Sequence, residues 1–571
     1  MKHRAPKKPY RLAAVYDTET TTIGTGKDSK AFVSLYIAND LRNRDIRQYE
    51  PDDDIIQFFR TSSKMLAFLK ELIKWGTDTG CIPIVAAYNL QFDLISVMKQ
   101  LADTYPMKVT AQSGTNIYTL DLLGTDGKTP ILRFWDTFFL EQRGLAAMGE
   151  TCGLAKAKGD WDYTLVRTPE TPITAQEAHY ASRDVQVIPA YLRFLLESNP
   201  WMSQEDLGVK ILTKTSIVRQ MSKNIIAPIK IPGSKRNVGQ AMSMLCSQEQ
   251  PADYDTYALR HACFRGGRTF TAANTAATVM YNVASIDVTS MHHTYINGRR
   301  IPVKFSKMNR QALQKAAENV IETPRDYILD HYDQPWICGL HVVVRFDNVR
   351  IRSGSPFAAW GIALEPESKF SKTIERKNDL YIEREGSIDD EESIRGNGYI
   401  DRAYQASFAF GKLMAAKTAI MNLTEVELWT FSRVYEYDDM TVLTGELSTN
   451  WILPPDYVTL QSNYLWAQKM AAKRINKTYR QGTPYTLPID KSVPESIANQ
   501  LRAGTVTNEF IASWYQVAVK GSFNALYGVQ AQNVYRSSYY VPAGSGGKII
   551  TDPDTVATPE NFSKLKSKCD K

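Results

Sequence analysis

Two acidic residues near the N-terminus have the spacing of a metal site. Asp17 and Glu19 follow an apolar segment, 12–16, that is typical of a β-strand. Because side chains alternate between the two faces of a strand, both carboxylates project from one face and can share a divalent ion. Such pairs are common on protein surfaces, so the meaning of this one depends on the acidic residues that follow.

A second motif comes after an apolar strand predicted over 82–87. It contains Asn89, Phe92 and Asp93. A helix that starts near Asn89 places Asn89 and Asp93 four residues apart on one helical face.

The third motif lies in a helix predicted over 175–190. Thr174 can cap this helix, and Glu177 three residues later completes a capping box. On the same helix, Tyr180 and Asp184 are again four residues apart, so both project from one face.

Together the three motifs supply the ligands that two-metal phosphoryl transfer requires. Two ions about 4 Å apart need roughly four carboxylates to offset their charge and to hold the attacking and leaving oxygens. The four predicted ligands are Asp17, Glu19, Asp93 and Asp184. Tyr180 is placed to orient the attacking water, a positioning role that this chemistry needs.

These motifs resemble Exo I, Exo II and Exo III of the 3′–5′ proofreading exonuclease in family B DNA polymerases. Residues 158–163 (Lys-Gly-Asp-Trp-Asp-Tyr) look like the K-G-D-x-D-Y signature of protein-primed members of the bacteriophage and adenovirus type. The resemblance implies that Lys158 assists catalysis. It also implies ligands for a single-stranded 3′ end, which are Thr20, Asn89, Phe92, Thr137 and Phe138. Bases could stack on the two phenylalanines, although core packing is the alternative interpretation of both rings.

A second acidic site is predicted at Asp287, which ends an apolar run over 283–286. Residues 287–291 resemble polymerase motif A, D-x-x-S-L-Y-P, but His292 stands where the tyrosine that excludes ribonucleotides is expected. Phe264, Arg265, Gly266 and Gly267 resemble the Y-x-G-G element that binds the template. Glycine lets the backbone approach a phosphate closely.

The strongest polymerase motif lies in a helix predicted from Asn508 onward, with Thr507 as its cap. Residues 520–528 resemble motif B, K-x-x-x-N-S-L-Y-G. The resemblance implies that Lys520 binds the phosphates of the incoming nucleotide, while Asn524 and Tyr527 line its base pair. We expect Gly528 to end the helix. A lysine-rich helix predicted over 461–480 is a further candidate for phosphate contact.

Motif C, the Y-x-D-T-D pattern that supplies a second palm aspartate, is missing from the sequence. The nearest string is Asp552-Pro553-Asp554, in which the proline would break a hairpin between the aspartates. Asp287 alone is not expected to support synthesis. The chain is therefore interpreted as the larger part of a split polymerase whose second subunit supplies motif C and the thumb. A vestigial polymerase half is the other interpretation.

The resemblance covers nearly the whole chain and implies a multidomain α/β plus α+β protein. An RNase H-like exonuclease domain would precede an incomplete palm and helical fingers. The expected divisions are 1–197, exonuclease; 198–300, linker and first part of the palm with motif A; 301–440, an insertion like terminal-protein region 1 with palm strands; 441–535, fingers with motif B; and 536–571, a C-terminal tail or partner-binding segment.

The amino-acid composition is compatible with these predictions but does not distinguish among them. A net charge of +7 fits a polyanion partner, although ordinary enzymes reach the same value. Six scattered cysteines without a C-x-x-C pair predict neither a zinc site nor a disulfide framework. We expect no membrane segment, because no stretch reaches 18 apolar residues. A cytoplasmic location is predicted, in the host cell if the protein is viral.

The function predicted from the sequence is that of a DNA-dependent DNA polymerase subunit with a 3′–5′ exonuclease. Two Mg²⁺ or Mn²⁺ ions are expected in each active site. Expected partners are primer-template DNA, a single-stranded 3′ end, dNTPs, the second subunit and a priming terminal protein. The alternatives are a stand-alone single-strand exonuclease and a non-catalytic DNA-binding replication scaffold.

Overall fold

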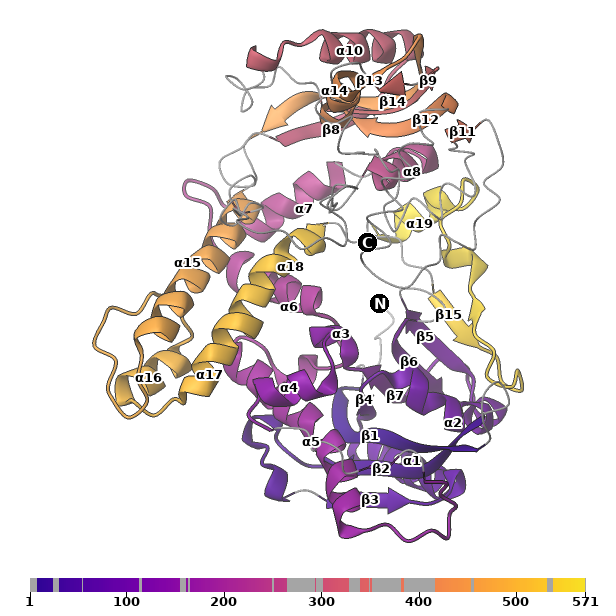
Figure 1. The fold of residues 1–571 in the computed structure, drawn as a ribbon, viewed down its shortest axis with the longest axis vertical. Helices are drawn as coiled ribbons and strands as arrows, with labels where there is room; N and C mark the ends of the chain where they lie inside the picture. The colour runs from indigo at the N-terminus through magenta and orange to yellow at the C-terminus, as the bar shows by residue number, and fades with distance from the viewer. Residues whose placement is uncertain are drawn as a thin grey trace. The chain divides into compact units, whose positions relative to one another are not determined.

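The structure is a computed structural model (Figure 1) that describes residues 8–23, 30–53, 55–111, 116–154, 161–162, 165–248, 251–263, 293, 301–327, 339–348, 350–351, 382–384, 416–452, 456–530 and 538–569. The chain divides into two units. The first combines Met1–Gly239 with Leu460–Ala557, and the second combines Gln240–Thr459 with Thr558–Lys571. The first unit is therefore discontinuous in sequence.

The first unit contains a mixed sheet in which the strand of Asp17 and Glu19 is central. This strand, β1, pairs in parallel with β4, and β4 pairs in parallel with β7, whereas β2 pairs with β1 in the antiparallel direction. Among the described residues the order is β16 (Ile550–Thr551), β15 (Ser538–Val541), β5 (Met107–Ala111), β6 (Ile117–Leu123), β7 (Pro130–Asp136), β4 (Ile82–Ala87), β1 (Tyr10–Ile23), β2 (Lys30–Asp40) and β3 (Ile55–Phe59).

Alternation along β1 separates two hydrophobic cores. Tyr16 packs with residues of α1 (Ser62–Thr79) and α2 (Leu90–Thr104) on one side of the sheet. Val15 packs with residues of α5 (Ala175–Ser198) on the other side. Asp17 and Glu19, which alternate in phase with Val15, therefore face α5. The predicted helix over 175–190 is confirmed, and it extends to Ser198.

Helices from late in the sequence complete the core on the α5 side of the first unit. Ala472, Leu501 and Trp514 belong to the same buried cluster as Val15 and Leu195. Besides α1, α2 and α5, the described part of the first unit contains the earlier helices α3 (Phe138–Glu141), α4 (Leu145–Thr151) and α6 (Lys214–Met221). The helices from late in the sequence are α15 (Asp456–Thr478), α16 (Glu495–Ala503), α17 (Asn508–Ser513) and α18 (Lys520–Gln530). Two π-helical segments, Ser222–Ile226 and Trp514–Val519, follow α6 and α17.

The motif B segment begins as predicted but ends later. The hydroxyl of Thr507 accepts a hydrogen bond from the Phe510 N–H, 3.0 Å away, and caps α17. The prediction that Gly528 ends the helix is wrong, because α18 continues to Gln530. One glycine inside a helix costs only about 1 kcal/mol, which the packing of the buried Phe523 and Leu526 can offset.

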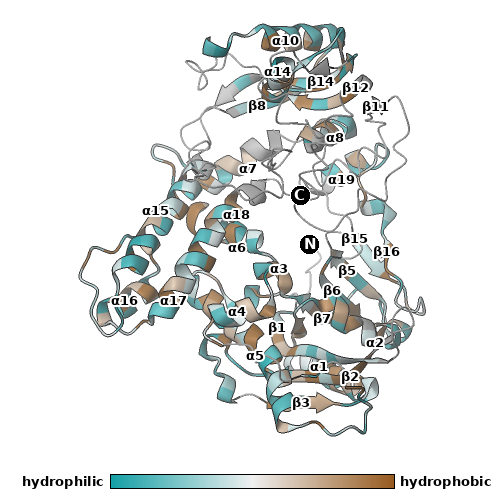
Figure 2. Ribbon diagram, viewed as in Figure 1, coloured by the Kyte–Doolittle hydropathy of each residue, from teal (hydrophilic) through white to brown (hydrophobic). Residues whose placement is uncertain are grey.

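The second unit contains an antiparallel sheet with helices against it. Leu340, Val342 and Val344 of its central strand pack in a core with α10 (Arg310–Glu322) and α14 (Glu425–Val434). The buried face of α10 is apolar and its other face is hydrophilic (Figure 2). Among the described residues the strand order is β11 (Ile382–Arg384), β12 (Ala416–Thr424), β9 (Gly339–Asp347), β14 (Asp439–Ile452) and β8 (Ile301–Lys307).

The remaining elements of the second unit are two short strands and three helices. The strands β10 (Arg350–Ile351) and β13 (Tyr435–Glu436) pair with each other. The α8 helix (Tyr254–Cys263) contacts α19 (Phe562–Cys569) through Tyr257 and Phe562, whose rings are 5.3 Å apart. The α7 helix (Val238–Gln248) spans the boundary between the units. No helix in the described part of the chain is both long and apolar enough to cross a membrane.

The last part of the chain is folded into both units. Within the first unit, β15 pairs with β5 in the antiparallel direction, and β16 pairs with β15. In the second unit α19 packs on α8. That residues 536–571 bind a partner stays a prediction.

Candidate metal centre

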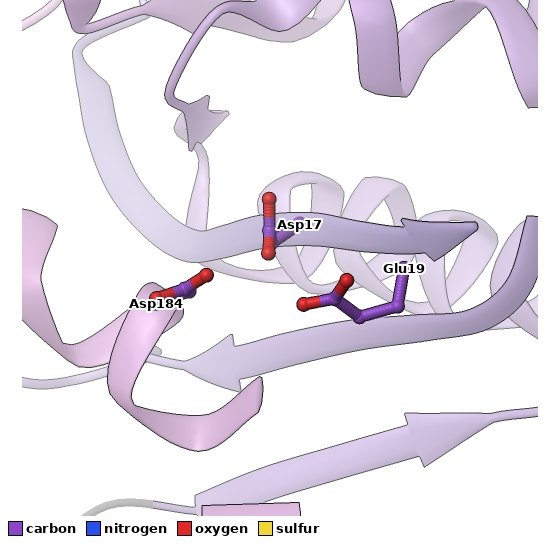
Figure 3. Close-up of side chains that lie close together, drawn as sticks. All are labelled: Asp17, Glu19 and Asp184. Carbon is purple, nitrogen blue, oxygen red and sulfur yellow. The ribbon is translucent and has the colours of Figure 1, made fainter. Parts of the chain in front are cut away.

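Three acidic side chains converge beside β1. Asp17, Glu19 and Asp184 each offer a carboxylate oxygen, and these oxygens all lie within 4.8 Å of one another. Figure 3 shows the three carboxylates turned toward a common point from β1 and α5. Glu19 and Asp184 are buried and Asp17 is partly buried.

The local sequence explains why these elements hold the three groups. Strand alternation sends Asp17 and Glu19 to the same face, as predicted. On α5 the predicted capping box is confirmed: the Thr174 hydroxyl accepts from the Glu177 N–H, and the Glu177 carboxylate accepts from the Thr174 N–H. The cap fixes where the helix begins and so fixes the height of Asp184 above the sheet.

Tyr180 lies one helical turn before Asp184 and is also buried. Its ring stacks on that of Trp161 with a centroid separation of 6.3 Å. Trp161 belongs to the K-G-D-x-D-Y segment, so the structure brings a described part of that segment against the third motif.

Asp93, the fourth predicted ligand, is not part of the three-carboxylate group. Its Oδ1 accepts a hydrogen bond of 2.6 Å from the hydroxyl of Thr18, which alternates with Asp17 and Glu19 on β1. The side chain is 2% exposed, and burial raises the pKa of Asp93 to about 7 although Thr18 opposes this shift. A metal-binding role for Asp93 stays a prediction.

The helix of the second motif begins near Asn89, as predicted, and a distant carboxylate caps it. Asp136 accepts hydrogen bonds from the N–H groups of Asn89, Leu90 and Phe138, at 3.0, 3.1 and 2.9 Å. Asn89 has φ +60° and lies outside α2, which starts at Leu90. Its side chain is therefore not needed as the cap. Burial raises the pKa of Asp136 to about 6.

The predicted single-strand ligands differ in accessibility. Phe92 is 52% exposed, as a base-stacking side chain must be. Phe138 is partly exposed and meets the ring of Tyr88 edge-on at 5.7 Å. Thr137 is buried, and its hydroxyl donates to the carbonyl of Ala87 at 2.9 Å. Thr20 is partly buried.

The donor set fits a hard divalent cation. Carboxylate oxygens are the ligands that Mg²⁺ and Mn²⁺ prefer. Three carboxylates this close repel one another, and a bound cation would offset that repulsion. Within the described residues, this is the group of three or more acidic, histidine or cysteine ligands that could hold a metal.

The polymerase motifs are described only in part. Lys158, Phe264, Arg265, Gly266, Gly267, Asp287 and His292 lie outside the described residues, as does the side chain of Tyr527. Lys520 and Asn524 lie exposed on α18.

The lysine-rich helix predicted over 461–480 corresponds to α15. The Lys469 ammonium lies 4.4 Å from the centroid of the Phe523 ring on α18. Burial lowers the pKa of Lys469, and the charges of Lys520 and Lys473 lower it further. The three lysines therefore form one cationic cluster, which a phosphate-rich ligand would neutralise.

Asp552 and Asp554 occupy a turn at the edge of the first unit. Asp552 caps a 3₁₀ turn, Pro553–Thr555, and accepts from the Asp554 N–H at 3.1 Å. Both side chains are partly or fully exposed, and the turn follows β16. This geometry does not place them in an antiparallel hairpin of the kind motif C forms.

No protein-family model and no curated protein sequence matches this chain. Solved structures do match. The orthorhombic crystal form of phi29 DNA polymerase matches with a TM-score of 0.51 and 14% identity, over 99% of this chain and 76% of that chain. Its post-translocation binary complex with primer-template DNA matches with a TM-score of 0.50 and 15% identity, over 93% and 69%.

The fold resembles that of phi29 DNA polymerase. This likeness extends over almost the whole chain, so the mixed α/β multidomain architecture expected from the sequence is confirmed at that level. At 14–15% identity it concerns the fold alone.

Sequence reasoning missed two residues that organise the site. One is Asp136, whose only local signal is its position at the end of the apolar strand 130–136. The other is Arg167, which is buried between β1 and α5 and carries no motif.

Proposed function

We propose that this chain is a DNA-processing enzyme whose first unit is a metal-dependent 3′–5′ exonuclease. The observation that carries the proposal is the convergence of Asp17, Glu19 and Asp184 on one point. The polymerase-like fold supports DNA as the substrate, since the matching binary complex contains primer-template DNA.

In the proposed reaction the three carboxylates hold Mg²⁺ or Mn²⁺, and Asp93 is the candidate for a further ligand. The bound ions would stabilise negative charge on the phosphodiester and favour an ionised water. Tyr180, one turn from Asp184, would orient that water from the helix side. Lys158 is proposed to assist, as the sequence resemblance implies.

We assign binding of the single-stranded DNA to the start of α2. The exposed ring of Phe92 would stack on a base, which is worth about 1–3 kcal/mol per base in single-strand binding proteins. Phe138 and Tyr88 form a second aromatic surface, joined to Asn89 through Asp136. These contacts would lead the 3′ end toward the carboxylates.

The test is degradation of a 5′-labelled single-stranded oligonucleotide with Mg²⁺. We expect a ladder shortened from the 3′ end, lost in Asp17→Ala and retained in Asp78→Ala. Asp78 is an exposed acidic residue of α1 and serves as the matched control. Products shortened from the 5′ end, or equal activity in Asp17→Ala, would refute the exonuclease.

A second proposed function is nucleotide addition, supported by the cationic cluster of Lys469, Lys473 and Lys520. Lys520, Asn524 and Tyr527 would bind the incoming dNTP, and His292 would select its sugar. Asp287 would hold metal ions together with a second carboxylate. Phe264, Arg265, Gly266 and Gly267 would bind the template.

We propose that the second carboxylate, on motif C, comes from a second polymerase subunit that also supplies the thumb. A terminal protein would prime synthesis. Primer extension by the chain alone, and then with proteins that co-purify from its native source, tests this. Extension by the chain alone would remove the need for a second subunit. A chain that degrades primers and never extends them, with or without those proteins, would leave the exonuclease as the function.

A further inference from the structure

A buried arginine, Arg167, joins the two elements that carry the metal-binding carboxylates. Its side chain is 3% exposed and pairs with Glu177 of α5. The Nε–H donates to Glu177 Oε1 at 3.2 Å, and one terminal nitrogen donates to the same oxygen. The other terminal nitrogen donates to the backbone carbonyls of Asp162 and Leu165.

The backbone of Arg167 continues this connection to β1. Its N–H donates to the hydroxyl of Thr21 at 3.1 Å, and that hydroxyl donates to the Leu165 carbonyl at 3.1 Å. Thr21 lies two residues after Glu19 on the same strand. Glu177 lies seven residues before Asp184 on the same helix. One side chain and its own backbone therefore link the strand of Glu19 to the helix of Asp184.

The guanidinium also supports the tyrosine of the site. The Arg167 Cζ lies 4.3 Å from the centroid of the Trp161 ring. The same ring also stacks on that of Tyr180, at a centroid separation of 6.3 Å and an interplanar angle of 30°. Trp161 thus contacts both Arg167 and Tyr180, so a shift of the guanidinium would also shift the ring against which the tyrosine packs.

We propose that Arg167 is a positioning residue of the metal centre, which sets the spacing between the β1 carboxylates and Asp184 and the orientation of Tyr180. This inference rests on the proposed metal-dependent function. Arginine suits the role because its planar fork can donate to Glu177 and to two carbonyls at once, which a lysine ammonium cannot do in the same geometry.

The chain contains a closely matched control. Arg133 on β7 also pairs with a buried carboxylate, Asp121, at 2.6 Å. It donates to the Gly208 carbonyl at 3.0 Å, and its guanidinium lies 4.2 Å from the centroid of the Tyr10 ring. The strand register aligns Arg133 with Leu12 of β1, five residues and roughly 16 Å along the strand from Asp17. Loss of Arg133 therefore reports what a largely buried, ion-paired arginine contributes to stability away from the carboxylates.

The experiment measures Mn²⁺ binding by electron paramagnetic resonance of the free ion, with the full-length chain and no substrate. Only the Mn²⁺ sites that disappear in the Asp17→Ala variant are counted as sites of this metal centre. We expect Arg167→Gln to weaken them by at least about tenfold, since loss of residues that orient metal ligands typically costs 10–100-fold in affinity. Arg133→Gln should change Mn²⁺ affinity by less than about twofold while lowering the melting temperature to a similar extent.

Hydrolysis of thymidine 5′-monophosphate p-nitrophenyl ester provides a second measurement, because this substrate has no upstream bases. We expect the Mg²⁺ concentration for half-maximal rate to rise in Arg167→Gln by the same factor as the Mn²⁺ dissociation constant. Should Arg167→Gln not fold, Arg167→Lys is measured instead. It keeps the charge but loses the fork, and we expect Mn²⁺ binding at least about threefold weaker.

Wild-type Mn²⁺ affinity in the folded Arg167 variants would overturn the proposal, as would an equal loss in Arg133→Gln. A wild-type chain without any Mn²⁺ site that Asp17→Ala removes would instead overturn the metal centre, and the role of Arg167 with it. The two failures are therefore distinguishable.

Discussion

The two units contain buried or partly buried acidic residues in contrasting surroundings. In the first unit, Asp17, Glu19 and Asp184 gather with one another. In the second unit, Glu446 of β14 is 1% exposed and contacts two side chains of the protein itself, Arg260 and His341. Arg260 donates to its two oxygens at 2.7 and 2.9 Å, and the Nδ1 of His341 lies 2.8 Å from Oε1.

The contrast appears in the electrostatics of Glu446. Burial alone would raise the pKa of Glu446, but hydrogen bonds from His341 and Arg260 hold it below its ordinary value. Its charge is compensated within the fold, so the simplest role for it is structural. Carboxylates that face one another favour binding of an additional cation. For this reason we propose a metal-binding, catalytic role for the three carboxylates of the first unit and a stabilising role for Glu446.

The largest expected effect tests the first half of this comparison. Asp184→Asn should reduce 3′–5′ degradation by about a thousandfold, because loss of a direct ligand should exceed the 10–100-fold cost of losing an outer partner. The melting temperature without metal should stay equal or rise, because a mutual repulsion is removed. Rates from a 5′-labelled oligonucleotide and thermal unfolding in EDTA measure both. A variant that is active but unstable would reverse the assignment.

The second half of the comparison predicts the opposite result for Glu446→Gln. This change leaves Arg260 without its full counter-charge and should destabilise the second unit by about 3 kcal/mol. Exonuclease activity below the melting temperature should be unchanged. Urea unfolding followed by circular dichroism measures the stability. A loss of nuclease activity without a loss of stability would show that Glu446 takes part in the reaction.

A smaller effect concerns the pH dependence of stability. The pKa of Asp93, raised by burial to about 7, exceeds that of the unfolded chain, so the folded state binds the proton more tightly. The stabilisation is present at low pH and is lost as pH rises through about 7. Between pH 5.5 and 8 the loss should be about 2 kcal/mol, since each unit is worth 1.36 kcal/mol.

Asp93→Asn should remove this part of the pH dependence, because the amide oxygen can still accept from Thr18. Thermal unfolding of both proteins in EDTA across this pH range measures the difference. If stability falls with pH to the same extent in the wild-type protein and in Asp93→Asn, Asp93 is already ionised in the folded protein at pH 5.5.

The smallest effect is expected at Phe92. Phe92→Ala should weaken binding of a single-stranded oligonucleotide by about 1 kcal/mol, or about fivefold, the lower limit for one stacked base. Ile55→Ala, at a residue of β3 that is 57% exposed, is the control. Fluorescence anisotropy with Ca²⁺ in place of Mg²⁺ measures binding without cleavage. Equal effects in the two variants would argue against stacking on Phe92.

Local patterns predicted the parts of the site that short-range physics determines. The same-face pair Asp17 and Glu19 follows from strand alternation, and the start of α5 follows from Thr174 and Glu177. Both depend only on residues within a few positions, which the sequence displays directly.

Long-range contacts account for what the sequence did not predict. The start of α2 is capped by Asp136, 47 residues after Asn89, so no local pattern could place Asn89 at φ +60°. Arg167 likewise is held by a hydrogen bond from its N–H to the hydroxyl of Thr21 on β1, 146 positions away. Membership of Asp93 in the metal centre, and the roles of Asp287 and Lys158, stay predictions.

The pairing of β15 with β5 has a consequence for the order of folding during synthesis. Roughly 430 residues separate the end of β5 from the end of β15, and the whole middle of the second unit is translated between them. At about 5–20 residues per second, β5 would leave the ribosome about 20–90 seconds before its partner strand exists. Until then the β5 edge of the first unit's sheet lacks its partner strand on the nascent chain, so a chaperone that shields strand edges would act here.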